Sequence, residues 1–227
     1  MKRLSLGLTV AILHSACANE VTDENESDTA GTSEEETQTN TIAESQLTER
    51  EEAILQGVHN QSLIFDYTVD SSYDTGAVWI EKYEFGEQTE WDIMHVSMEI
   101  TGSDSGYIVF TPAELYGTED QLLLTVGIST GTSSHYGTTS DSLPDLGTET
   151  DEDGFSENTI WGTSSNQTID LTSGEIILGS LIAASMDDGL STLSSGFYTD
   201  AEENREEIEE YEAIYLIKAE FTKESEE

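Results

Sequence analysis

The sequence predicts a mainly β protein: a single antiparallel β-sandwich of about seven to nine strands, Ig-like or similar, with one short N-terminal helix. Three observations support this prediction. Apolar and polar residues alternate with a period of two along several segments, glycine-containing turn motifs separate these segments, and the chain lacks regularly alternating strands and helices. The predicted domain, residues 47–224, is long enough to bury roughly 70% of its unfolded surface.

A short helix is expected at the start of this domain. Thr48 followed by Glu51 forms a capping-box pattern, in which each side chain can bond the backbone N–H of the other residue. Good helix formers occupy residues 49–56, and Gly57 supplies a stop signal.

Four segments have one apolar and one polar face and are predicted as strands. Their apolar faces are Leu63, Phe65, Tyr67 and Val69; Met94, Val96, Met98 and Ile100; Leu122, Leu124, Val126 and Ile128; and Tyr215, Ile217, Ala219 and Phe221. Five weaker segments are predicted as further strands, at 77–85, 107–111, 158–162, 167–171 and 175–184. The last is apolar on both faces, so it is either a central buried strand or a short helix.

Two long polar segments interrupt these strands, at residues 129–158 and 199–212. Loops longer than about fifteen residues are uncommon unless they are functional or disordered. The first segment is therefore the main region in which a binding site is expected.

The chain begins with the layout of an export signal. Lys2 and Arg3 precede an apolar run, and small residues follow up to Cys17, which is the only cysteine. This layout resembles a bacterial lipoprotein precursor with an atypical lipobox, because His14 stands where leucine is usual. The resemblance implies a signal peptide of residues 1–16 and lipidation of Cys17, with the acyl chains anchored in the outer face of the cell membrane. The alternative is ordinary signal cleavage after Ala18 and secretion.

Residues 17–46 are predicted to form a disordered tether. After Cys17 they are rich in Glu, Asp, Thr, Ser and Asn, and they contain no Lys, Arg or aromatic residue. Such a segment cannot bury enough apolar surface to fold alone, and its like charges extend it. We expect it to hold domain 47–224 away from the membrane, with residues 225–227 as a short C-terminal tail.

The chain is strongly acidic, with 48 Asp and Glu residues against 7 Lys and Arg residues and a net charge of −41. Loss of Lys2 and Arg3 with the signal would change this net charge to −43. Nucleic acid is excluded as a partner, because phosphate binding needs clustered Lys and Arg. Self-repulsion of this size favours a monomer, and salt would relieve it. We interpret the acidity first as halophilic adaptation and second as divalent-cation binding.

One part of segment 129–158 has an incomplete calcium-loop pattern. Glu149, Asp151, Asp153 and Glu157 place carboxylates around Gly154, which would permit the sharp turn of such a loop. The twelfth position is Ile160, where a bidentate Glu is usual. Calcium is therefore the only cofactor that the sequence suggests. The alternative interpretation of this segment is a solvated acidic loop that binds no ion.

Residues 127–131 spell GxSxG around Ser129, as in the nucleophile elbow of α/β-hydrolases. The following residues do not form a helical pattern, so a hairpin or loop turn is the better interpretation. His135 and Asp141 lie near Ser129 only in sequence, which is weak evidence for a triad. No catalytic residue is assigned, and the scattered histidines do not have the spacing of a zinc site.

Trp79, Glu81 and Tyr83 share one face of the predicted strand 77–85. Two aromatic rings about 13 Å apart with a carboxylate between them would suit stacking on a sugar chain, as in carbohydrate-binding β-sandwiches. The alternative is that the rings belong to the core and Glu81 lies at its edge.

These features favour a surface-tethered, non-enzymatic extracellular binding or interaction module, with a cell-surface carbohydrate or protein as its ligand. One alternative is a cell-wall-acting hydrolase that uses paired carboxylates. Another is a passive acidic spacer or surface coat. Two carboxylates facing each other in an aromatic-lined cleft would favour the hydrolase, whereas acids spread over convex surface would favour the interaction module.

Overall fold

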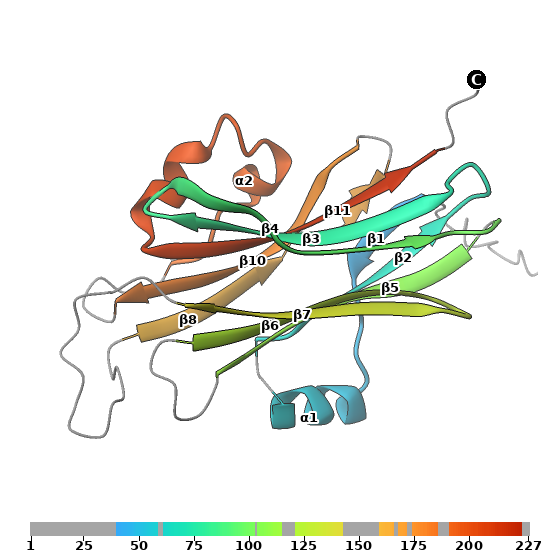
Figure 1. The fold of residues 1–227 in the computed structure, drawn as a ribbon, viewed down its shortest axis with the longest axis horizontal. Coiled ribbons are helices and arrows are strands. Elements are labelled where there is room, and N and C mark those ends of the chain that lie inside the picture. Colours follow the sequence, from blue (N-terminus) through green and yellow to red (C-terminus); the bar gives the residue numbers. More distant parts are fainter. Residues whose placement is uncertain are drawn as a thin grey trace, which may run out of the picture. The chain divides into compact units, whose positions relative to one another are not determined.

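Two antiparallel β-sheets face each other in the computed structural model (Figure 1). The structure describes residues 40–58, 61–102, 104–114, 121–142, 159–165, 168–171, 174–185 and 191–223. The predicted mainly β fold class and sandwich architecture are confirmed. The described residues form eleven strands, more than the seven to nine that the sequence predicts.

Sheet A has the strand order β7-β6-β5-β2-β1-β9. Its strands are β1 (Thr41–Glu44), β2 (Leu63–Val69), β5 (Asp104–Glu114), β6 (Gln121–Thr130), β7 (Ser134–Ser142) and β9 (Thr168–Asp170). Sheet B has the order β4-β3-β11-β10-β8. Its strands are β3 (Thr75–Glu84), β4 (Glu87–Glu99), β8 (Thr159–Ser165), β10 (Ile176–Ser185) and β11 (Ala213–Thr222).

The main core lies between the two sheets, because period-two alternation directs one face of each strand toward the opposite sheet. All four strong apolar faces predicted from sequence belong to this core, with Met94 packed half-buried against it. The segment that was ambiguous between strand and helix is strand β10, between β11 and β8. Its Leu181 packs between the sheets, whereas Ile182 packs on the outer face of sheet B.

A second, smaller cluster covers part of that outer face. The helix α2 (Ser195–Thr199) and the 3-10 helix η2 (Arg205–Glu210) pack against β10 and β11, with Phe197 and Ile208 buried (Figure 1). The hydroxyl of Ser194 accepts a hydrogen bond from the N–H of Phe197 and so caps α2. Segment 199–212, predicted as a polar loop, therefore contains η2, which packs on the outer face of sheet B.

Helix α1 (Glu49–Val58) forms as predicted, with the capping box at its start. The backbone N–H and the hydroxyl of Thr48 donate to the carboxylate of Glu51 at 2.8 and 2.7 Å, and the N–H of Glu51 returns a bond of 3.4 Å to the Thr48 hydroxyl. No helix in the described ranges is long and apolar enough to cross a membrane.

Two strands correct the sequence analysis. Strand β1 lies inside segment 17–46, predicted as disordered tether, yet it pairs with both β2 and β9 and buries Ile42. The folded domain therefore begins before residue 47. Strand β7 lies inside segment 129–158, predicted as a loop, and pairs with β6 as a hairpin.

Candidate functional site

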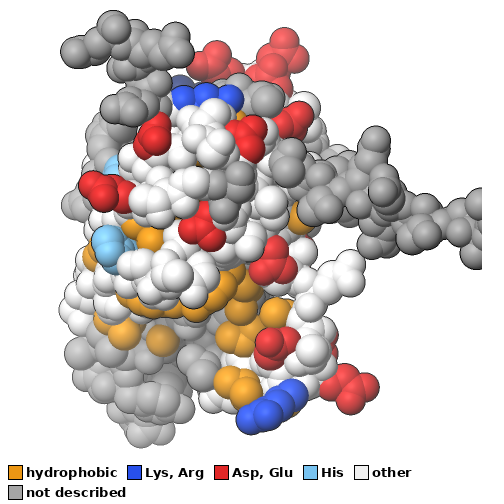
Figure 2. Space-filling view, turned by 90° about the vertical axis from the view of Figure 1, so that its right-hand side faces the viewer, with side chains coloured by type: hydrophobic (Ala, Val, Ile, Leu, Met, Phe, Trp, Pro, Cys, Tyr) orange, Lys and Arg blue, Asp and Glu red, His pale blue; other side chains and the backbone are white. Residues whose placement is uncertain are grey.

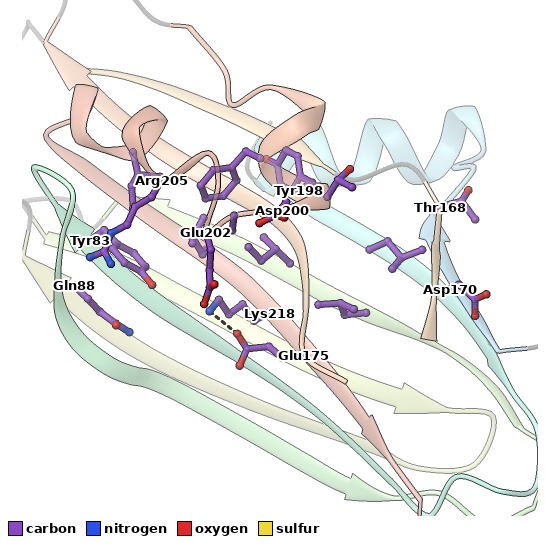
Figure 3. A pocket seen from close by; sticks show the side chains of 18 residues that line it. Tyr83, Gln88, Thr168, Asp170, Glu175, Tyr198, Asp200, Glu202, Arg205 and Lys218 are labelled. Atoms are coloured by element: carbon purple, nitrogen blue, oxygen red, sulfur yellow. Dashed lines mark hydrogen bonds and ion pairs between the residues drawn. The ribbon is translucent and has the colours of Figure 1, made fainter. Parts of the chain in front are cut away.

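A groove of about 800 Å³ opens on the outer face of sheet B, beside α2 and η2 (Figure 3). Strands β3, β10 and β11 contribute Tyr83, Ile177 and Lys218. The segment around α2 and η2 contributes polar side chains, Asp200, Glu202 and Arg205 among them, and β9 adds Thr168 and Asp170. Arg205 lies near Tyr83 and Gln88 in this view, whereas Thr168 and Asp170 lie away from them (Figure 3).

A cluster of two ion pairs, both made by Lys218, forms the floor of this groove. The Nζ atom of Lys218 lies 2.8 Å from Oε2 of Glu81 and 2.7 Å from Oε1 of Glu175, the second contact being the dashed line in Figure 3. The Glu81 carboxylate also accepts hydrogen bonds from the indole of Trp79 at 3.1 Å and from the hydroxyl of Tyr83 at 2.9 Å. Lys218 is 8% exposed and Glu81 is 4% exposed. Charges this deeply buried persist because each one is paired and hydrogen-bonded.

These contacts fix the protonation states of the cluster. Burial raises the pKa of Glu81, but hydrogen bonds from Lys218, Trp79 and Tyr83 outweigh burial and lower it overall. Burial lowers the pKa of Lys218, but its bonds to Glu175 and Glu81 raise it overall. Burial and the Glu81 carboxylate raise the pKa of Tyr83. At neutral pH, Glu81 is therefore an ionised acceptor, and Lys218 and Tyr83 are donors.

The three predicted sugar-binding residues share one face of β3, but that face is largely closed. Trp79 is 6% exposed and stacks on His95 of the neighbouring strand β4, with ring centroids 5.7 Å apart and planes 10° apart. Glu81 is buried under its three partners. Of the three residues, only Tyr83 lines the groove. The exposed stacking platform expected from Trp79 and Tyr83 is therefore absent, because long-range packing covers Trp79.

The GxSxG segment belongs to the β6–β7 hairpin, as the sequence favours. The N–H of Thr130 donates to the carbonyl of Ser133 at 2.8 Å, and Ser129 pairs with Ser134 across the hairpin. Nδ1 of His135 lies 2.8 Å from the carbonyl of Ser97, and Asp141 accepts from Tyr215. Ser129, His135 and Asp141 thus have separate partners and do not form a triad.

The remaining predicted site residues lie outside the described residues: Cys17, Glu149, Asp151, Asp153 and Glu157. In the part of the chain that the structure describes, no group of three or more His, Cys, Asp or Glu residues is placed to hold a metal ion.

Sequence reasoning missed most of the groove. Lys218 and Glu175 have no motif, and Tyr198 bonds the hydroxyls of Ser164 and Ser180 from positions distant in sequence. One signal was available. In a chain with only 7 basic residues, a lysine within a strand of alternating apolar residues is unusual, and both Lys82 and Lys218 are of this kind.

Comparison with known proteins identifies one family. The model of the YgaN domain matches residues 41–221, which run from the first residue of β1 into β11. The match covers about four fifths of the chain. No curated protein and no solved structure matches the chain.

Proposed function

We propose that this chain, which belongs to the YgaN domain family, is a surface-tethered, non-enzymatic binding module whose ligand site is the groove on sheet B. The observation that supports this function best is the groove itself, with a pre-formed ion cluster on its floor beside the ring of Tyr83. Its volume of about 800 Å³ lies within the range of roughly 300–1,000 Å³ that is typical of ligand pockets.

The chemistry of the lining favours a short, neutral oligosaccharide as the ligand. Gln88, Arg205 and Lys218 supply hydrogen-bond donors, and the acidic residues of the lining supply acceptors. The rings of Tyr83 and Tyr198 provide apolar surface against which the C–H faces of a sugar can pack. An anionic ligand would meet four carboxylates against two cations, with the carboxylates coming from Asp170, Glu175, Asp200 and Glu202.

The arrangement of carboxylates argues against the alternative of a hydrolase. Glycoside hydrolysis needs a protonated carboxylic acid and a second carboxylate on either side of the scissile bond. The lowered pKa of Glu81 leaves it ionised, and the ammonium of Lys218 occupies the position between Glu81 and Glu175. This geometry supports binding rather than catalysis. The remaining alternative, a passive acidic spacer, gives no reason for the groove.

The tether and its location are part of the same proposal. The export signal and Cys17 support a lipid anchor on the outer face of the membrane, with secretion as the alternative. On the face drawn in Figure 2 acidic side chains are scattered and the Lys and Arg side chains do not gather, which supports a monomer that does not bind nucleic acid. Expression in a lipoprotein-competent host, beside the variant Cys17→Ser, tests the anchor. Wild-type protein in the medium with Asn19 at its N-terminus would refute it.

The groove is tested by titrating neutral oligosaccharides from an array screen against wild type and Arg205→Gln. Arg205 is exposed at the groove, so the variant removes a charged donor with little effect on the core. Loss of one such hydrogen bond is expected to weaken binding roughly tenfold. Arg50→Gln removes the same charge from the exposed face of α1 and serves as the matched control. Equal affinities of the two variants, or no neutral glycan bound by wild type, would contradict the assignment.

A further inference from the structure

The outer face of sheet A is uncharged over three strands, in a chain whose net charge is −41. Core residues define the inward positions of β5, β6 and β7, so the outward positions follow from the alternation. Positions 105–113 of β5 and the whole of β6 and β7 carry no Asp, Glu, Lys or Arg on this side. Hydroxyl side chains and two tyrosines occupy much of it.

The two tyrosines are exposed side by side. Tyr136 is 51% exposed and Tyr107 is 39% exposed, and their hydroxyl oxygens lie 3.2 Å apart. Gly127 on β6 is the cross-strand partner of Tyr136. A Cβ atom on Gly127 would lie 2.0 Å from Cδ1, 2.4 Å from Cε1 and 2.9 Å from Cγ of the Tyr136 ring. The ring therefore rests directly on the backbone of β6, and only glycine leaves space for it.

Hydroxyl pairs flank this ring along the hairpin. The hydroxyls of Thr125 and Thr138 lie 3.0 Å apart at the next outward register position, and those of Ser129 and Ser134 lie 2.6 Å apart at the previous one. Successive outward positions are roughly 7 Å apart along a strand. The face thus presents hydroxyl, aromatic and hydroxyl groups in a row parallel to the strands.

Packing across the strands accounts for part of this arrangement, because an aromatic ring over a cross-strand glycine stabilises a sheet. That account covers the position of Tyr136 but not the second exposed ring or the exclusion of charge. In a protein with a net charge of −41, long-range repulsion disfavours a second copy of the chain as the occupant of this face. The face matches a partner that is itself uncharged and rich in hydroxyl groups.

We propose that this face, the Tyr107–Tyr136 platform, binds an extended, neutral polysaccharide along the β6–β7 hairpin. The C–H face of one sugar ring packs on the ring of Tyr136, and the hydroxyl of Tyr107 reaches this position from across β6. The neighbouring sugars along the hairpin bond the exposed hydroxyls of Ser134 and Thr138. The platform is a second site, on the opposite sheet from the groove, and it suits a long chain rather than a short oligosaccharide.

The test is co-sedimentation of the detergent-solubilised full chain with microcrystalline cellulose and with chitin. Wild type is expected to be retained on one of these solids. Tyr136→Ala is expected to lose at least about tenfold in affinity, whereas Tyr136→Phe keeps the ring and stays within about twofold of wild type. Thr138→Glu, an exposed change that places a charge beside the ring, is expected to reduce retention too, and it replaces Tyr136→Ala if that variant does not fold.

Arg205→Gln separates this site from the groove, because it alters only the groove. Retention of Arg205→Gln at the wild-type level, together with loss in Tyr136→Ala and Thr138→Glu, supports the platform whatever the groove binds. The proposal is overturned if wild type is retained on neither solid, if Tyr136→Ala and Thr138→Glu both bind like wild type, or if Arg205→Gln alone abolishes retention.

Discussion

The Nζ atom of Lys82 on β3 lies 2.8 Å from Oδ2 of Asp141 on β7, and this contact joins sheet B to sheet A. Lys82 also pairs with Glu84 at 2.7 Å and donates to the carbonyl of Ser142 at 2.8 Å. The hydroxyl of Tyr215 donates a hydrogen bond of 2.7 Å to Oδ2 of Asp141. Burial lowers the pKa of Lys82, but its bonds to Asp141 and Glu84 raise it overall, so the lysine is charged inside the protein.

Replacement of Lys82 by methionine is expected to destabilise the protein by about 3–5 kcal/mol, because it leaves the carboxylate of Asp141 without its cation. Urea unfolding of wild type and variant measures the difference. Lys223→Met removes the same charge from an exposed position and should cost less than about 1 kcal/mol. Equal losses in the two variants would show that only the net charge matters.

Removal of β1 is expected to destabilise the domain, although β1 lies in the segment that the sequence assigns to the tether. Ile42 is buried, and its burial alone is worth roughly 1.5–3 kcal/mol. Asn40 fastens the start of this strand, since its side chain donates to Asp70 and accepts from the Asp70 N–H, each at 2.8 Å. A chain starting at residue 40 should unfold like one starting at residue 18. A chain starting at residue 47 should have a markedly lower melting midpoint, and equal midpoints for all three would rule out this role for β1.

The four strands that the sequence predicts most clearly are those with an apolar face to bury. All nine predicted segments overlap strands of the structure, including β9, which has no fully buried residue. The two strands that were missed have almost no apolar face: β1 contributes a single buried apolar residue, Ile42, and the inward positions of β7 are His135, Gly137, Thr139 and Asp141. Their neighbours in the sheet make them strands, and this tertiary context overrides local pattern.

The site was predictable only in part, for a related reason. Period-two alternation correctly places Trp79, Glu81 and Tyr83 on one face. Whether that face is open depends on elements distant in sequence. His95 covers Trp79, and the register that pairs Glu81 with Leu216 brings Lys218 beside Glu81. Neither the strand pairing nor its register can be inferred from residue types along β3 alone.

The contacts of Asp70 predict an acid-dependent contribution to stability. Hydrogen bonds from Ser72 and Asn40 lower the pKa of Asp70 to about 2, against about 3.9 in an unfolded chain. A lowered folded-state pKa stabilises the protein above the unfolded pKa, and this contribution is lost as the pH falls toward the folded pKa. The gap in unfolding free energy between wild type and Asp70→Ala should therefore be constant above about pH 5 and narrow between about pH 4 and 2.

Urea titrations across this pH range measure that gap. Asp66→Ala removes an exposed carboxylate from β2, the strand that ends just before Asp70, and controls for the change in net charge. A gap for Asp70→Ala that does not change with pH would mean that the charge of Asp70 contributes nothing to its contacts with Asn40 and Ser72.

The acidity of the chain predicts that salt raises its stability. With 48 acidic residues against 7 basic ones, long-range repulsion acts on the compact state more than on the extended one. The Debye length falls from about 10 Å at 0.1 M salt to about 3 Å at 1 M, so added NaCl should remove most of this repulsion. The melting midpoint should rise from about 0.05 to 2 M NaCl, and KCl should act equally, since screening depends on ionic strength. The chain starting at residue 40 should keep most of this response if the repulsion lies within the folded domain. A midpoint that stays level or falls with salt would show that the negative charge does not destabilise the fold.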